Sequence, residues 1–205
     1  MKRLFLATGN EDKIKEIAAL LLDLPVELKT FRDFPGLPKV EETGTTLKEN
    51  AFLKARAYFL ATGLPTLADD TGLEVDAMGG QPGVFSSRFA GPDASYAENV
   101  SKVLGFLEGI RAKERKARFR CVIAMVFSPV DERSVEGRLE GSITVVPIGA
   151  GGFGYDPIFY VPELEKTLAE LSSEQKNRIS HRGRALEKAK AILSDWARDT
   201  IQSPA

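Results

Sequence analysis

The sequence predicts an α/β protein in which helices flank an elongated mixed central sheet, with two lobes around a cleft. Three observations support this class. Short apolar runs alternate with segments of helical hydrophobic spacing. The run over 117–128 is long and apolar enough for a central strand. Finally, 205 residues at 43% hydrophobic content can bury a substantial core, and no repeat or Gly/Ser-rich linker separates parts, so 1–205 is predicted to be a single domain.

The first third of the chain is predicted to hold strands at 3–8, 26–31 and 64–69. A Pro/Gly-rich loop occupies 34–44. A long helix over 46–62 is expected to begin with a Thr46–Glu49 capping box and to end at Gly63. An earlier helix follows the first strand, with apolar positions at helical spacing: Ile14, Ile17, Ala18, Leu21 and Leu22.

The remaining chain starts with a strand-like "GLEVDAM" and a loop, followed by a helix over 94–109. The run 117–128 begins with polar and apolar alternation and becomes apolar on both faces, so it should pass from a sheet margin to its centre. It is expected to pair with 134–147 as an antiparallel hairpin. Two last helices are predicted at 166–178 and 183–198. The apolar stripe of the 94–109 helix is formed by Val100, Val103, Leu104 and Leu107.

Composition excludes several classes of protein. A formal net charge of −1 gives no overall preference for nucleic acid or membrane surfaces. One cysteine, Cys121, and one histidine, His181, exclude an internal disulfide framework and a Cys/His zinc site, so carboxylates would have to hold any metal. The apolar stretch near the N-terminus is too short for a signal peptide or a membrane helix. We therefore expect a cytoplasmic protein with no membrane partner.

The first candidate site is "ATGNEDK" (7–13), where a strand meets a helix. Free backbone N–H groups, the Thr8 hydroxyl, a turn at Gly9 and the Lys13 ammonium together suit an anion. The segment lacks GxxxxGK[ST] spacing, which disfavours a P-loop enzyme. The alternative is an ordinary helix start, with Asn10 as N-cap and Lys13 solvated.

The second candidate site consists of four carboxylates: Glu41, Glu42, Asp69 and Asp70. Side chains alternate along a strand, so Asp69 and Asp70 cannot both face one ligand. Thr71 and Gly72 are expected to let the chain turn beside it. Mg²⁺ uses one or two carboxylates together with substrate phosphates. The alternative is a structural turn in which Asp69 or Asp70 caps local N–H groups.

The third candidate site is the glycine-rich "GAGGFGYDP" (149–157). Its glycines satisfy GxGxxG, but Pro157 and an extended "IFYV" follow instead of a helix, so a Rossmann dinucleotide site is rejected. The loop would present Phe153 and Tyr155 for stacking on a base, beside Asp156 as an acceptor. Core aromatics flanked by glycines are the alternative.

The fourth candidate site is "KNRISHRGRAL" (176–186). Lys176 and Ser180 share one face of a helix end, and His181 and Arg182 lie in the following turn. Guanidinium and ammonium groups suit phosphate or carbonyl oxygens. A solvated turn with Ser180 as N-cap is the alternative. A basic run, "RAKERKARFR" (111–120), is interpreted as a solvated loop because an acidic residue interrupts it.

The order of five blocks resembles one family. "TGNEDK", "EETGTTLKENAFLKA", "ADDTGLEVDAMGGQPGVFSSRFAG", "GGFGYDPIF" and "SHRGRAL" together look like the inosine/xanthosine triphosphate pyrophosphatase family over nearly the whole chain. The resemblance implies a nucleotide-binding cleft and Mg²⁺-dependent hydrolysis of non-standard purine triphosphates (ITP, dITP, XTP) between the α and β phosphates. It also implies a homodimer and no nucleic-acid partner.

The resemblance further implies roles for individual residues. Asp70 would be the catalytic proton acceptor and a metal ligand, with Glu41 the second metal-linked carboxylate and Glu42 left open. Thr71 stands where serine is usual, and the hydroxyl is kept. Lys13, Lys54 and Lys176 would offset phosphate charge. The implied substrate-binding residues are Thr8, Gly9, Asn10, Glu11, Asp12, Lys13, Thr71, Phe153, Gly154, Tyr155, Asp156, Lys176, His181 and Arg182.

Two other functions stay open at this point. One is a Maf-type nucleotide pyrophosphatase, of the septum-inhibition family, with a different base preference. The other is a nucleic-acid-binding module that uses residues 111–120, although no aromatic residues are interleaved with that basic run as single-strand binding would require.

Overall fold

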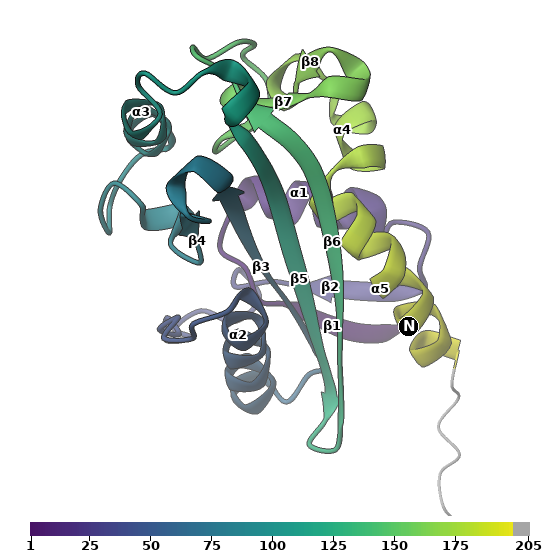
Figure 1. The fold of residues 1–205 in the computed structure, drawn as a ribbon. Coiled ribbons are helices and arrows are strands. Elements are labelled where there is room, and N and C mark those ends of the chain that lie inside the picture. Colours follow the sequence, from purple (N-terminus) through teal and green to yellow (C-terminus); the bar gives the residue numbers. More distant parts are fainter. Residues whose placement is uncertain (199–205) are drawn as a thin grey trace, which may run out of the picture. The chain divides into compact units, whose positions relative to one another are not determined.

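A computed structural model of the protein describes residues 1–198 and confirms a mixed α/β fold with helices beside a central sheet (Figure 1). Residues 199–205 of the predicted single domain lie outside the described residues. The strands are β1 (Lys2–Leu6), β2 (Val26–Lys29), β3 (Thr66–Val75), β4 (Pro82–Gly83), β5 (Lys116–Ser128), β6 (Asp131–Ile143), β7 (Phe159–Val161) and β8 (Lys166–Thr167). The α-helices are α1 (Glu11–Leu20), α2 (Leu47–Thr62), α3 (Tyr96–Phe106), α4 (Ser173–Ile179) and α5 (His181–Arg198).

The strand order is β2-β1-β3-β5-β6-β7-β8, with β4 paired to β3. β1 is parallel to both β2 and β3, whereas β3–β4, β6–β7 and β7–β8 are antiparallel. The sheet is therefore mixed, as predicted. No helix within residues 1–198 combines the length and apolar character needed to cross a bilayer.

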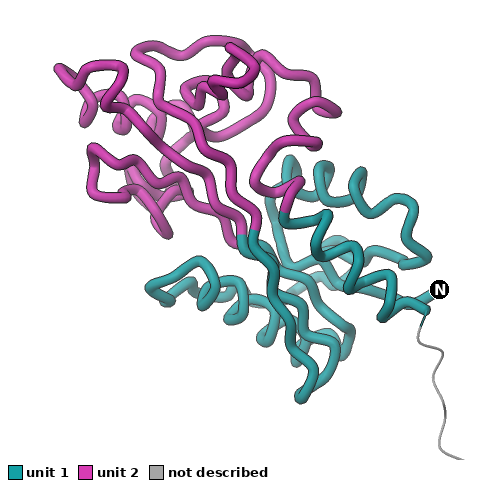
Figure 2. The backbone as a smooth tube through the Cα atoms, turned by 45° about the vertical axis from the view of Figure 1, so that its right-hand side comes forward, with its two compact units in different colours: residues 1–69, 122–136, 185–205 teal, residues 70–121, 137–184 magenta. Residues whose placement is uncertain are grey.

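The chain divides into two compact units (Figure 2). Unit 1 contains residues 1–69 and 122–136 and most of α5; unit 2 contains 70–121 and 137–184. The division falls between Asp69 and Asp70, inside β3. Each unit has its own core.

Unit 1 is built on the parallel strands β2-β1-β3. The β1-α1-β2 and β2-α2-β3 connections run in opposite directions along the sheet, so right-handed crossovers place α1 and α2 on opposite faces (Figure 1). Phe5 of β1 is fully buried, and its ring lies 5.3 to 5.8 Å from those of Phe31, Phe34 and Tyr58. This aromatic cluster anchors α2 and the segment before it to the sheet.

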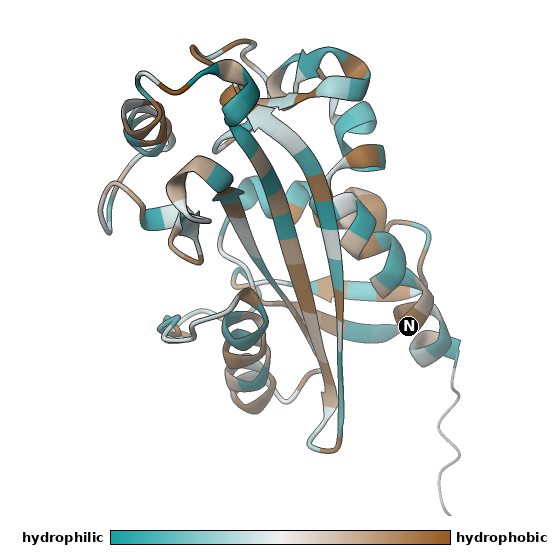
Figure 3. Cartoon of the chain, in the orientation of Figure 1, coloured by the Kyte–Doolittle hydropathy of each residue, from teal (hydrophilic) through white to brown (hydrophobic). Residues whose placement is uncertain are grey.

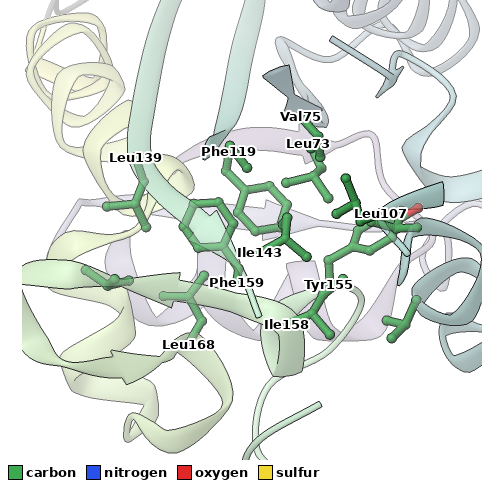
Figure 4. Close-up of a cluster of buried hydrophobic side chains, with 14 of the residues drawn as sticks. Leu73, Val75, Leu107, Phe119, Leu139, Ile143, Tyr155, Ile158, Phe159 and Leu168 are labelled. Carbon is green, nitrogen blue, oxygen red and sulfur yellow. The ribbon is translucent and has the colours of Figure 1, made fainter. Parts of the chain in front are cut away.

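Unit 2 has a core of buried side chains from β3, α3, β5, β6 and the segment after residue 154 (Figure 4). Phe119 of β5 and Phe159 of β7 are central to it, with ring centroids 4.6 Å apart. Val100, Val103 and Leu107 are buried there, and Leu104 packs against the cluster. The predicted apolar stripe of this helix is thus confirmed.

The long strand β5 changes character along its length (Figure 3). From Ala117 to Arg120 buried and half-buried residues alternate, whereas every residue from Cys121 to Val126 is buried. The predicted passage from a sheet margin to its centre is confirmed. The hairpin with β6 is also present, although β6 spans 131–143 instead of 134–147.

Two predicted elements and one predicted apolar position differ clearly from the structure. The strand expected to end at the carboxylates continues to Val75, because Gly72 stays out of the left-handed region and the following residues are still buried. The helix expected at 166–178 begins only at 173, where Ser172 and Gln175 form a capping box. Leu22, expected on the apolar face, is exposed because α1 ends at Leu20.

Candidate active site

The adjacent aspartates lie in the middle of β3, and both are buried, with 1% and 7% of their surface exposed. Successive strand side chains point to opposite faces, so the two carboxylates meet different surroundings. Asp69 Oδ2 lies 2.8 Å from Lys13 Nζ. Asp70 Oδ2 is a buried oxygen that accepts no hydrogen bond within residues 1–198. The expectation that the two aspartates do different jobs is consistent with this.

In unit 1, Asn10 is the N-cap of α1. Its side chain accepts the N–H groups of Asp12 and Lys13 at 3.0 and 3.2 Å, and its own N–H donates to Thr8 Oγ1 at 3.3 Å. The alternative of an ordinary helix start is therefore confirmed for Asn10 as N-cap. It is wrong for Lys13, which is not solvated but ion-paired with Asp69. Glu11 instead faces outward and bonds Arg32 at 2.8 Å.

The two neighbouring glutamates of unit 1 differ in their surroundings. Glu42 is half-buried, and its Oε1 lies 2.6 Å from Lys54 Nζ of α2. Glu41 is exposed. Lys54, expected to offset phosphate charge, is thus near this carboxylate pair, and Glu42 already serves as its partner.

In unit 2, the structure brings together residues from three of the predicted motifs. Arg182 is 2% exposed, and its Nη2 donates to Thr71 Oγ1 at 3.2 Å. The Phe153 ring lies close to two cations, with its centroid 5.6 Å from Arg182 Cζ and 4.3 Å from Lys176 Nζ. A half-buried aromatic face and a fixed multi-donor cation therefore share one cluster.

Asp156 organises the glycine-rich loop of unit 2. Its Oδ2 lies 2.5 Å from Lys176 Nζ and accepts the Phe153 N–H at 2.8 Å. Gly152 has a φ of 68°, and a Cβ there would lie 2.1 Å from the same carboxylate oxygen. The loop can therefore close around Asp156 only with glycine at this position. Within the described residues a three-residue 3₁₀ turn (Asp156–Ile158) and then the strand β7 follow the loop, in place of the α-helix that a Rossmann site requires.

Tyr155 and Phe153, predicted together as stacking rings, lie in different surroundings. The Tyr155 ring belongs to the unit 2 core, which matches the structural alternative, and burial raises the pKa of its hydroxyl. That hydroxyl donates to the Ser86 carbonyl at 2.8 Å, while Ser86 Oγ accepts the Leu73 N–H at 2.8 Å. Nothing in the sequence pattern distinguished Ser86 as a link between β3 and this loop.

His181 is the first residue of α5 and is 3% exposed. Its ring stacks on Phe119, with centroids 4.4 Å and planes 15° apart. Ser180 Oγ accepts the Gly183 N–H at 3.0 Å, which confirms its N-cap role. A Cβ on Gly183 would lie 1.8 Å from the Asn177 carbonyl oxygen, so the tight turn between α4 and α5 requires glycine.

The basic run 111–120 is the expected solvated segment only in its first part, residues 111–114, which are exposed. Arg115 is 5% exposed, and its guanidinium donates to the carbonyls of Leu107, Ile110 and Thr144. Arg118 and Arg120 lie on β5 and pair with Glu74 of β3, and Arg118 also pairs with Asp76, the residue after β3. The second part of the run therefore belongs to the fold, because Arg115 holds three carbonyls and β5 begins at Lys116.

Comparisons with known proteins place these features in context. A sequence model of the Ham1 family matches residues 4–192. A Geobacter sulfurreducens protein described as a dITP/XTP pyrophosphatase is 51% identical over 196 residues, which are 95% of this chain and 96% of that protein. A relative of the same description from Geobacillus kaustophilus is 49% identical over 92% of each chain. A HAM1 protein structure from Coxiella burnetii superposes with a TM-score of 0.88 at 46% identity, covering 95% of this chain and all of that one.

Proposed function

Because the chain belongs to the Ham1 family, we propose that it hydrolyses the non-standard purine nucleoside triphosphates ITP, dITP and XTP to the monophosphate and pyrophosphate. The observation that carries the proposal is a sequence identity of 49% and 51%, over 92% and 95% of this chain, to two proteins described as dITP/XTP pyrophosphatases. The buried carboxylate and cation clusters are chemically suited to this reaction.

The phosphate chain is proposed to bind the strand–helix junction of unit 1, residues 8–13. Lys13 is the partly exposed cation of this junction: its side chain is 18% exposed, whereas that of its partner Asp69 is fully covered. A triphosphate brings close to four negative charges, so it can draw the ammonium group partly away from Asp69. Two helix N–H groups are already satisfied by Asn10, so Lys13 carries most of the attraction.

Asp70 is proposed to accept the proton of the attacking water. The proposal rests on the family resemblance and on the burial of this carboxylate, which is 7% exposed. The enzyme is proposed to use a divalent cation, Mg²⁺, held by Asp70 and Glu41. No group of three or more His, Cys, Asp or Glu side chains within the described residues forms a metal cage. This donor set fits a hard ion that keeps water and phosphate ligands. When bound, Mg²⁺ would offset phosphate charge and polarise the α-phosphoryl group.

The base is proposed to bind the Phe153–Arg182 cluster of unit 2, where Phe153 offers an aromatic face. Thr71 accepts from one arm of the guanidinium, and a guanidinium presents several N–H donors of the kind that suits the 6-oxygen of a keto purine. The 6-amino group of adenine would set donor against donor and leave buried groups unpaired. Gly154, Tyr155 and Asp156 are proposed to shape this side of the site, and Lys176 and His181 to complete it.

The decisive experiment is to measure pyrophosphate release from ITP and ATP in the presence of Mg²⁺. We expect rapid release from ITP and XTP and little from ATP; equal rates, or no release from ITP, would refute the proposal. A panel with UTP and methylated dTTP separates it from a Maf-type activity. Salt-dependent oligonucleotide binding without turnover would instead favour the nucleic-acid module.

The same proposal extends to the setting of the enzyme. We place it in the cytoplasm without nucleic-acid or membrane partners, and we propose a homodimer on the strength of the family resemblance. The two units are proposed to act as one domain, because β3, β5, β6 and α5 each contribute residues to both. Light scattering coupled to size-exclusion chromatography tests the dimer directly.

A further inference from the structure

Loop 38–44 of unit 1, which carries both Glu41 and Glu42, is bonded to α2 at regular intervals. Asn50 Oδ1 accepts the Gly44 N–H at 2.8 Å. Lys54 Nζ lies 2.6 Å from Glu42 Oε1. The Tyr58 hydroxyl donates to the Pro38 carbonyl at 3.0 Å and accepts the Val40 N–H at 3.3 Å. The three helix residues are four apart, so they form one stripe along α2.

The distance between successive contacts is similar along α2 and along loop 38–44. Four residues of α-helix rise about 6 Å, and two residues of nearly extended chain span at most about 7 Å. Stepping back along the helix by four residues therefore advances the loop by two, from Val40 to Glu42 to Gly44. The residues between them, Glu41 and Thr43, are exposed.

Asn50 is an unusual residue to find at this point of the helix. It is fully buried, and the bond from Gly44 is the single hydrogen bond of its side chain within residues 1–198, because Nδ2 is buried without a partner. Burying an amide that is half-satisfied costs stability. A Cβ on Gly44 would lie 2.6 Å from Asn50 Oδ1, so the loop backbone also approaches closely. The hydrogen bond from the Gly44 N–H, which fixes the loop against α2, offsets this loss of stability.

We propose that Asn50 and Tyr58 are positioning residues that set the register of loop 38–44, so that Glu42 is engaged by Lys54 and Glu41 is presented to the metal. A shift of the loop by one residue would exchange the two glutamates. The inference rests on the proposed function, because it assigns Glu41 as the metal-linked carboxylate. It adds that residues of helix α2, and not the glutamates themselves, determine which of the two glutamates is presented to the metal.

The test measures Mn²⁺ affinity by electron paramagnetic resonance, with the protein bound to a non-hydrolysable α,β-methylene analogue of ITP. Tyr58→Phe keeps the ring that packs on Phe5 and Phe31, and Asn50→Ala removes only the amide. Each should weaken Mn²⁺ binding about three- to tenfold, the effect of losing one hydrogen bond. In a Glu41→Gln background neither variant should weaken binding further, because the positioned ligand is already gone.

Thr62→Ala is the matched control, since Thr62 bonds the Tyr58 carbonyl and the Leu64 N–H at the far end of α2. It should lower thermal stability and leave Mn²⁺ affinity unchanged. Wild-type affinity in both Asn50→Ala and Tyr58→Phe, or an equal loss in the Glu41→Gln background, would overturn the inference. Failure of the proposed function looks different: the wild-type protein would release no pyrophosphate from ITP.

Discussion

Each unit contains a lysine–aspartate ion pair with a buried carboxylate, and the two pairs differ in how much of the lysine is exposed. In unit 1 the Lys13 side chain keeps 18% of its surface exposed beside Asp69. In unit 2 Lys176 and Asp156 are only 6% and 4% exposed, and Lys176 also lies over the Phe153 ring. The same two residue types therefore make one pair whose cation can reach an incoming anion and one that is enclosed.

The difference suggests separate tasks for the two pairs. A partly exposed ammonium can exchange a carboxylate for a phosphate with little rearrangement, because both offer anionic oxygen acceptors and an ammonium group imposes no fixed planar geometry on its partner. An enclosed pair exchanges poorly, since breaking it would leave a buried charge. We therefore propose that Lys176 acts mainly by holding Asp156 and its loop, and that Lys13 contacts the substrate itself.

The largest expected effect comes from the carboxylate next to the first pair. Asp70→Asn should lower kcat about 10²- to 10⁴-fold, the usual contribution of a general base, while the protein stays folded. Steady-state hydrolysis of ITP and a thermal melt measure both quantities. If Asp69→Asn is the inactive variant and Asp70→Asn keeps wild-type turnover, the two faces of β3 have been assigned the wrong way round.

Removing the enclosed lysine should chiefly affect stability. Lys176→Met leaves Asp156 buried without its cation, which typically costs about 3–5 kcal/mol. Chemical denaturation followed by circular dichroism measures the loss. A free energy of unfolding within error of wild type would show that Asp156 finds other compensation and that the pair is not enclosed in solution.

The more exposed lysine should act in the opposite way. Lys13→Met is expected to raise KM for ITP roughly tenfold, by the loss of one charge-assisted contact. It should destabilise the fold less than Lys176→Met, because water can reach this site. Titrations at two ionic strengths provide a check, since the KM difference should shrink as salt screens the phosphate charge. A stability loss larger than that of Lys176→Met would reverse the comparison.

The smallest expected effect concerns a fully exposed acid, which sharpens the contrast with the buried pairs. Hydrogen bonds from the Thr45 hydroxyl and from the main chain lower the pKa of Glu49 below its ordinary value of 4.5. A depressed carboxyl pKa stabilises the fold above the unfolded pKa, and this contribution is lost as pH falls through the folded value. Thr45→Ala should therefore lower Tm slightly at neutral pH and leave it unchanged well below pH 4.5. A constant difference across that range would contradict this cause.

Local sequence signals correctly predicted the helix ends that are formed by specific capping residues. The Thr46–Glu49 capping box and Gly63 at a φ of 66° appear where they were expected, because each rests on contacts within one turn of helix. The transition within β5 was likewise readable from its apolar pattern. Prediction failed where the local sequence suits two structures equally well. Gly72 is an example, because glycine permits a turn but here lies inside strand β3.

What the sequence determined by itself was the class of fold, the order of the motifs and the family to which that order belongs, because these depend on residue types along the chain. Tertiary structure alone decided how each motif is used. Lys13 forms an ion pair with Asp69, the Tyr155 ring packs in the core, and the buried Arg115 donates hydrogen bonds to three backbone carbonyls. Each outcome depends on which distant segment supplies the partner, and no local pattern encodes that choice.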